Sequence, residues 1–225
     1  MIHSIIERHD KLTPLTETEI KIVATAAKLF LEQGFSATTH RQIAKEAGIG
    51  LGTLTYHYRA KEDLLHILME ELMDYHLDII EAATEQKQDN LFAYATEITM
   101  QIALCETNKM AWDLYHAAYT HPTTFAYIKD WASKKAHHLL CDITNLQESD
   151  FKNLEHITSG IELAALLTAC DRYFTLEDKI RLTLDSMMKI YDIPAPLREE
   201  TIEKVLATDY EQLAQDMFAR FVARL

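Results

Sequence analysis

Glycine is nearly absent from this chain outside one short stretch, and this distribution limits the fold more than any other feature of the sequence. Only five of the 225 residues are glycine, and four of those five lie between positions 34 and 52. Proline is equally rare, with four residues. Because tight turns depend on these two residue types, a loop-rich all-β protein is disfavoured, and we expect an all-α fold of about nine to eleven helices.

The segment that holds these glycines has the pattern of two short helices with a turn between them. Thr39 and Gln42 have the spacing of a capping box, in which a hydroxyl and an amide satisfy free N–H groups at a helix start. Gly48 stands where this helix should end, and a second helix is expected from about Leu51 to Tyr58. Two short helices joined by a glycine turn form a helix-turn-helix, whose second helix can enter the major groove of DNA.

A longer amphipathic helix is expected before this motif, from about residue 17 to residue 33, with Gly34 at its end. Together the three helices would share a small apolar core. Its predicted members are Ile20, Val23, Ala27, Phe30, Phe35, Ile43, Ala47, Ile49, Leu54 and Tyr58. We therefore assign residues 1–65 to one domain, a three-helix head, with a flexible tail over about residues 1–16.

Several short motifs in this head keep a fixed register with one another. They are Gly34-Phe35, Thr38-Thr39, Ile43-Ala44, Ala47-Gly48-Ile49, Gly52-Thr53-Leu54, His57-Tyr58, Lys61 and Leu64. In this register, the segment from about residue 17 to residue 65 resembles the N-terminal domain of the tetracycline-repressor (TetR) family of transcriptional regulators. The resemblance implies a DNA-binding head on a larger helical body, residues 66–225, that binds a small molecule and forms a dimer.

The resemblance also implies which residues touch DNA, through phosphates or base edges. They are Thr39, Arg41, Leu51, Gly52, Thr53, Thr55, Tyr56, His57 and Lys61. Two of these positions depart from the usual pattern of the family. Leu51 replaces a lysine or polar residue and can meet only a thymine methyl group, and Thr55 replaces a tyrosine and reaches less far. The operator sequence therefore does not follow from the resemblance.

The charge distribution permits DNA binding, although the net charge of −13 at first opposes it. Residues 1–65 contain eight Lys and Arg and eight Asp and Glu, so the head is neutral and the body carries the whole excess. Affinity for phosphate depends on the local face of a protein rather than on its total charge. A neutral head must rely on helix N-termini, hydroxyl groups and a few placed cations.

The body should be helical throughout, because apolar residues recur at helical spacing along it. The predicted helices lie at about 61–86, 89–105, 109–120, 122–143, 149–170 and 175–191, with one or two closing helices over 197–224. Pro122 fits the first turn of its helix, where a missing N–H costs nothing. Helices 149–170 and 175–191 would pair with their copies in a second subunit as a four-helix bundle, or pack within the chain. We favour a homodimer, since one short recognition helix reads few base pairs.

A segment rich in large amphipathic side chains, 109–131, is the candidate ligand pocket. Its predicted pocket residues are Met110, Trp112, Tyr115, His116, Tyr119, Phe125 and Trp131. Taken singly, aromatic residues at helical spacing more often belong to the core. As a group, and given the resemblance, they indicate a pocket with polar handles. His137, His138 and Cys141 have metal-ligand spacing but lack a further ligand, so we expect no metal and no cofactor.

The sequence holds no sign of catalysis and none of a membrane span. It has no Gly-x-Ser-x-Gly elbow, no phosphate-binding glycine loop and no His-Glu-x-x-His. Three widely spaced cysteines, no signal-peptide core and no apolar run of membrane length favour a cytoplasmic protein. We expect a homodimeric repressor that a small apolar or amphipathic molecule releases from a palindromic operator. The alternative is a helical protein-interaction module with a degenerate DNA-binding head.

Overall fold

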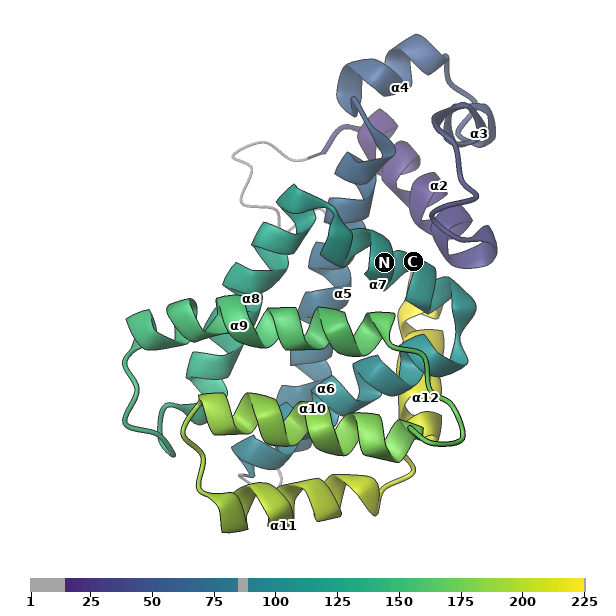
Figure 1. Cartoon of the computed structure of the whole chain (residues 1–225). Helices are drawn as coiled ribbons and strands as arrows, with labels where there is room; N and C mark the ends of the chain where they lie inside the picture. Colours follow the sequence, from purple (N-terminus) through teal and green to yellow (C-terminus); the bar gives the residue numbers. More distant parts are fainter. Residues whose placement is uncertain (1–14, 85–88, 225) are drawn as a thin grey trace.

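The computed structural model describes residues 15–84 and 89–224 of the chain. Over these residues it has eleven helices and no strand, which confirms the expected all-α fold (Figure 1). The helices are α2 (Glu17–Gln33), α3 (His40–Glu46), α4 (Leu51–His57), α5 (Lys61–Thr84), α6 (Asn90–Thr107), α7 (Lys109–Thr120), α8 (Pro122–Leu140), α9 (Glu148–Leu167), α10 (Leu176–Ile190), α11 (Ala195–Leu206) and α12 (Tyr210–Arg224).

Threonine capping boxes begin the first two helices of the head. The Thr39 hydroxyl accepts a hydrogen bond from the Gln42 backbone N–H at 3.2 Å. In return, the Gln42 side-chain oxygen accepts one from the Thr39 backbone N–H at 2.8 Å. Thr16 and Glu19 make the same pair of bonds at the start of α2. The start of α3 therefore lies where the sequence predicts it, because both partners of the cap are only three residues apart.

The three helices of the head share the small apolar core that their spacing predicts. Eight of the ten predicted core side chains are buried, and Ile20 and Ile49 are half-buried at its edge. Leu15 and Thr16 fall within the expected tail, yet Leu15 is buried and Thr16 caps α2. The rest of the expected tail, residues 1–14, lies outside the described residues.

Helix α5 leaves the head at Lys61 and runs into the body (Figure 1). It packs against α2 of the head and against α6, α7 and α8 of the body. The buried apolar side chains form two clusters, one continuous from the head along α5 to α12, and the other among α6, α8, α9, α10 and α11. The last residues of the predicted helix 61–86 lie outside the described part of the chain. Head and body thus share a continuous apolar core along α5.

Two predicted features of the later helices are confirmed. Pro122 is the first residue of α8, where it has no N–H to leave unpaired. The closing segment consists of two helices, α11 and α12. They are separate because the Asp209 side chain accepts a hydrogen bond from the Gln212 N–H at 3.2 Å and starts a new helix there.

The buried face of α9 differs from the apolar stripe in its sequence. That stripe includes Leu154, Ile157 and Ile161, but Ile157 is 56% exposed and the other two are half-buried. The buried side carries instead Phe151, Glu155, Thr158, Ser159, Glu162, Ala165 and Leu166. The structure therefore does not bury this stripe fully within the chain, and the pairing of the helix with its copy in a second subunit stays a prediction. Polar residues of α9 face the interior because other helices bring hydrogen-bond partners to them.

Candidate nucleic-acid interface and a buried polar cluster

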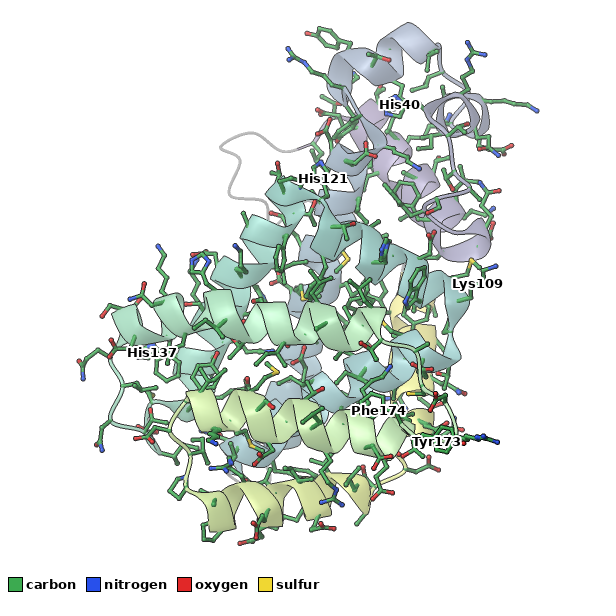
Figure 2. The ribbon with its side chains drawn as sticks, viewed as in Figure 1. His40, Lys109, His121, His137, Tyr173 and Phe174 are labelled. Atoms are coloured by element: carbon green, nitrogen blue, oxygen red, sulfur yellow. The ribbon has the colours of Figure 1, made fainter. Side chains whose placement is uncertain are left out.

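Helix α4 lies at the far end of the head from the body, and it presents most of its side chains to solvent (Figure 1). Within α4 only Leu54 is buried. Leu51 is 41% exposed and Tyr56 is 85% exposed, and Thr53 and Thr55 are exposed beside them. Figure 2 shows long side chains that project from α3 and α4 into the space around the head. Of the nine predicted contact residues, all except His57 and Lys61 are exposed.

Gly52 stands on this open face of α4. A Cβ atom added to Gly52 would meet no atom within 4 Å. The absence of a side chain at this position therefore serves no packing within the head. It leaves room for an outside partner to approach the helix backbone closely.

His57 and Lys61 are tied into the head itself. The His57 ring nitrogen lies 3.4 Å from a carboxylate oxygen of Glu19. Lys61 Nζ donates hydrogen bonds to the backbone carbonyls of Phe35 at 2.8 Å and Thr38 at 3.0 Å, and it lies 4.0 Å from the centre of the Phe35 ring. Two of the three N–H donors of Lys61 thus hold the loop between α2 and α3, and its predicted contact with a DNA phosphate stays a prediction.

The same loop is joined directly to α7 of the body. The backbone N–H of Ser36 donates to an Asp113 oxygen at 2.7 Å, and the Ser36 hydroxyl donates to the other Asp113 oxygen. Gly34 makes room for this contact, since a Cβ at that position would lie 2.9 Å from Asp113 and its φ is +97°. The head is therefore held to the body at two places, through α5 and through Asp113.

A cavity of about 700 Å³ lies where the head meets the body. Its lining residues come from the end of α4, from α5 and from the start of α8. They are His57, Tyr58, Glu62, Asp63, His66, Ile67, Glu70, Glu71, Asp74, His121, Thr123, Thr124 and Tyr127. Five of them are carboxylates, so this cavity is acidic. The cavity could not be predicted from the sequence, because its walls come from segments far apart along the chain.

Inside the body, a second group of polar side chains lies between the helices, and we call it the buried polar cluster. One half of the cluster is centred on Glu97 of α6, which is 1% exposed. Lys135 Nζ lies 2.5 Å from one Glu97 oxygen, and His76 Nδ1 lies 3.3 Å from the other. The second nitrogen of His76 is 3.3 Å from the Tyr115 hydroxyl. Glu97 thus has a charged partner, and each of its two carboxylate oxygens has a hydrogen-bond partner.

The other half of the cluster holds two carboxyl groups of α9. Glu162 accepts a hydrogen bond from the Tyr119 hydroxyl at 2.9 Å, and Gln101 donates to the same hydroxyl at 2.8 Å. Glu155 accepts from the Tyr191 hydroxyl at 2.5 Å and from the Ser159 hydroxyl at 2.8 Å. These partners are all neutral, so neither carboxyl group has a cation in contact among the described residues.

The two halves differ accordingly in their pKa values. Burial alone would raise the pKa of Glu97, but the charges and hydrogen bonds of Lys135 and His76 outweigh it and lower the pKa to about 2. Burial raises the pKa of Glu162 to about 8. The neighbouring Glu155 and Glu97 add to this rise, and the charge of Lys135 opposes it. Burial also raises the pKa of Glu155, against its hydrogen bonds. At neutral pH the cluster therefore holds a proton on Glu162.

The structure brings together some of the predicted pocket residues and separates others. Tyr115 and Tyr119 are buried and belong to the buried polar cluster. Phe125 packs on the Tyr119 ring at 5.4 Å, and the Trp131 ring lies 5.0 Å from Lys135 Nζ.

The other three predicted pocket residues lie apart from the cluster. Trp112 stacks on His116 at 4.7 Å and donates a hydrogen bond to the Leu166 carbonyl at 3.1 Å. Met110 lies beside Gly34, near the contact between head and body.

Sequence reasoning missed the charged members of the cluster. Glu97 is the only acid among residues 91–105 of the apolar helix α6. Glu155 and Glu162 stand seven residues apart on α9, which places them on one helix face. The positions of these acids could be seen in the sequence. A prediction from hydrophobicity, however, places apolar residues in the interior and therefore assigns all three carboxylates to the surface. Their partners lie as far as 43 residues away along the chain.

Two further features concern ions and membranes. Among the described residues, no three His, Cys, Asp or Glu side chains are grouped so that they could hold a metal ion. None of the helices, over the part searched, combines the length and the apolar character needed to cross a membrane.

Apolar side chains also remain uncovered on the outer face of α9 and α10, where the two helices lie side by side (Figure 1). Ile157 is 56% exposed, Leu167 52% and Leu182 60%. Isolated exposed apolar residues are common, but these three belong to adjacent helices. The face is suited to contact with another protein surface.

The head matches a known family of sequences. Residues 22–68 match the model of the "Bacterial regulatory proteins, tetR family". Among curated proteins, the chain is 30% identical over 86 residues to the probable HTH-type transcriptional regulator YttP of Bacillus subtilis, a match that covers 36% of this chain and 42% of that protein. The first curated relatives are each matched over less than half of their length.

Most of the architecture matches solved structures at low sequence identity. A crystal structure of RolR in complex with the ligand resorcinol has a TM-score of 0.63 at 15% identity, and the match covers 82% of this chain and 92% of that one. FadR of Thermus thermophilus, a transcriptional repressor in complex with lauroyl-CoA, has a TM-score of 0.52 at 18% identity, with 75% and 92% covered. These similarities establish the fold, including that of the body.

Proposed function

From the premise that this chain belongs to the tetR family of bacterial regulatory proteins, we propose that it is a homodimeric repressor which a small molecule releases from its operator. The observation that carries this proposal is the exposed face of α4. A seven-residue helix that buries only Leu54 and displays hydroxyl, tyrosine and glycine positions is arranged to meet an external surface. The proposed surface is the major groove of DNA, and the site of action is then the cytoplasm.

A dimer supplies the second recognition helix that a single short one needs. Two copies of α4 held about 34–36 Å apart would enter successive major grooves, and a palindromic operator would match the two-fold symmetry of the protein. The outer face of α9 and α10, with Ile157 and Leu182 uncovered, supports the pairing of these helices with their copies. A bound dimer would block transcription, which makes repression the expected outcome.

Helix α7 is suited to couple a ligand in the body to the head. One side of α7 carries Tyr115 and Tyr119, which belong to the buried polar cluster. Another side carries Asp113, which holds Ser36 of the head. A ligand that shifts α7 would therefore change the position of the head and the spacing of the two recognition helices. Ligand and DNA would then oppose each other reciprocally, by a coupling of typically about 1–3 kcal/mol.

The experiment that tests this proposal is selection of DNA by the protein without added ligand. The chain is incubated with random genomic fragments, captured, and the bound fragments are sequenced. We expect enrichment of a palindrome with half-sites one helical turn apart, and loss of that enrichment in Thr53→Ala/Tyr56→Ala. Absence of enrichment at low salt would contradict the proposal and favour a protein-interaction module with a degenerate head.

A further inference from the structure

We propose that the buried polar cluster is the recognition site for the effector, and that the effector is a small amphipathic molecule with a positively charged amine. This inference rests on the function proposed above and adds the chemical class of the ligand. The geometry points to a cation through the charge balance of the cluster, through an unpartnered hydroxyl group and through the aromatic rings around it.

The charge balance is the first argument. The cluster contains three carboxyl groups and two basic residues, and both basic residues lie against Glu97, Lys135 at 2.5 Å and His76 at 3.3 Å. Glu155 and Glu162 are 3% and 6% exposed, and within the described part of the chain the hydrogen bonds to both come from neutral hydroxyl groups. A buried carboxylate without a cation is costly, because the interior solvates it poorly. A ligand that brings one positive charge to this half of the cluster would remove that cost.

The hydroxyl group of Tyr94 also points to a ligand, because it has no hydrogen-bond partner among the described residues although Tyr94 is only 2% exposed. It is near enough to Glu97, Glu155 and Glu162 for each to raise its pKa further, after burial. A buried polar group without a partner is rare and needs an explanation. The oxygen of Tyr94 can accept a hydrogen bond from an ammonium group that also donates to a carboxylate.

The surroundings of the cluster are the third argument. The rings of Trp131 and Tyr94 lie 5.0 Å and 5.7 Å from Lys135 Nζ, so their centres are already near one cation. Phe125 packs on Tyr119 from the outer side. Aromatic faces attract ammonium groups and also bury the apolar part of a ligand. Phe125 and Trp131 are half-buried, and their displacement would admit a molecule from the surface to the cluster.

Binding of an amine would bring the positive charge of its ammonium group into the cluster and would release one proton from Glu162. At neutral pH Glu162 holds a proton, because burial and the neighbouring carboxylates raise its pKa to about 8. An ammonium group beside Glu162 favours the ionised carboxylate, so the proton leaves when the ligand binds. Release of a proton is therefore a specific signature of this site, and a merely structural Glu162 would not produce it.

The test uses three probes that share a hydroxyphenyl ring and a short side chain but differ in charge: tyramine, 4-ethylphenol and 4-hydroxyphenylacetate. Trp112→Phe leaves Trp131 as the only tryptophan, so quenching of its fluorescence reports on the cluster. We expect saturable quenching by tyramine, with a dissociation constant at least tenfold below that of 4-ethylphenol, and none by the anion. Calorimetry at pH 7 in two buffers of different ionisation enthalpy should show net proton release.

Variants on α9 decide whether the carboxylate is responsible. Glu162→Gln keeps the shape of the protonated acid, so the variant should fold. It should weaken tyramine binding at least tenfold, abolish proton release and leave 4-ethylphenol binding unchanged. Glu148→Gln, the same change at an exposed position of the same helix, should alter nothing.

Three results would overturn the inference: no saturable response to tyramine, equal affinity for tyramine and 4-ethylphenol, or tyramine binding unchanged in Glu162→Gln. All of these measurements are made without DNA. A protein that selects a palindrome but ignores tyramine would keep the proposed function and lose this inference.

Discussion

Replacement of Glu162 by glutamine should make the protein less sensitive to rising pH. The folded state raises the pKa of Glu162 from 4.5 to about 8, because the carboxyl group is buried beside Glu155 and Glu97. Between these two values the folded protein holds a proton that the unfolded chain has released. Stability is therefore lost as pH rises through this window, and glutamine at position 162 removes the effect.

The magnitude follows from a single proton. Uptake of one proton changes the free energy of unfolding by about 1.4 kcal/mol per pH unit. Between about pH 6 and pH 7.5, the free energy of unfolding of the wild-type protein should fall by about 2 kcal/mol relative to that of the variant. For a chain of this length, that corresponds to a relative shift of roughly 4–8 °C in Tm. Glu155 has a raised pKa as well, so the free energy of unfolding of the variant still falls as pH rises.

The assay is urea unfolding at fixed protein concentration, at several pH values across this range, followed by circular dichroism. Glu155 interacts with Glu162 and the remaining titrating groups are common to both proteins, so the difference between the two slopes reports the proton held by this pair of carboxyl groups. Glu148→Gln is the matched control, and it should follow the wild-type curve. Parallel curves for wild type and Glu162→Gln would refute the claim that a buried proton is held at this position.

Three further substitutions test the head. Lys61→Met should lower the free energy of unfolding by about 2 kcal/mol, measured by urea titration, since it removes two charged hydrogen bonds to backbone carbonyls; an unchanged midpoint would contradict that role. Gly34→Ala should lower the free energy of unfolding by about 1–3 kcal/mol, because φ is +97° and the new Cβ would lie 2.9 Å from Asp113. An unaltered Tm would contradict this prediction. Tyr56→Ala should change stability by less than about 0.5 kcal/mol yet weaken binding to operator and random DNA alike; gel-shift titration measures this, and undiminished affinity would exclude the contact.

The sequence predicted the head well because its signals are local. The capping pair Thr39 and Gln42 and the terminator Gly48 each act within a few residues, and their effects do not depend on the rest of the chain. The body helices were also placed correctly to within a few residues, since apolar spacing and Pro122 are local as well. The contacts of the DNA-facing residues stay predictions until a complex is measured.

Contacts between distant segments could not be read from the sequence. Lys61 is held by carbonyls more than twenty residues away, so its role in the head had no local signal. Glu162 faces inward because Tyr119, from another helix, donates a hydrogen bond to it. The spacing of apolar residues on α9 predicts that the opposite face is buried, because this spacing does not reflect hydrogen-bond partners from other helices. For the same reason, only part of the predicted aromatic pocket coincides with the buried polar cluster.

The central claim is that two copies of α4 read DNA together. Hydroxyl-radical footprinting on a selected genomic fragment tests it most directly. The account predicts two protected segments whose centres are about 10–10.5 base pairs apart, and loss of both in Thr53→Ala/Tyr56→Ala. One protected segment, or two that persist in this double variant, would contradict it.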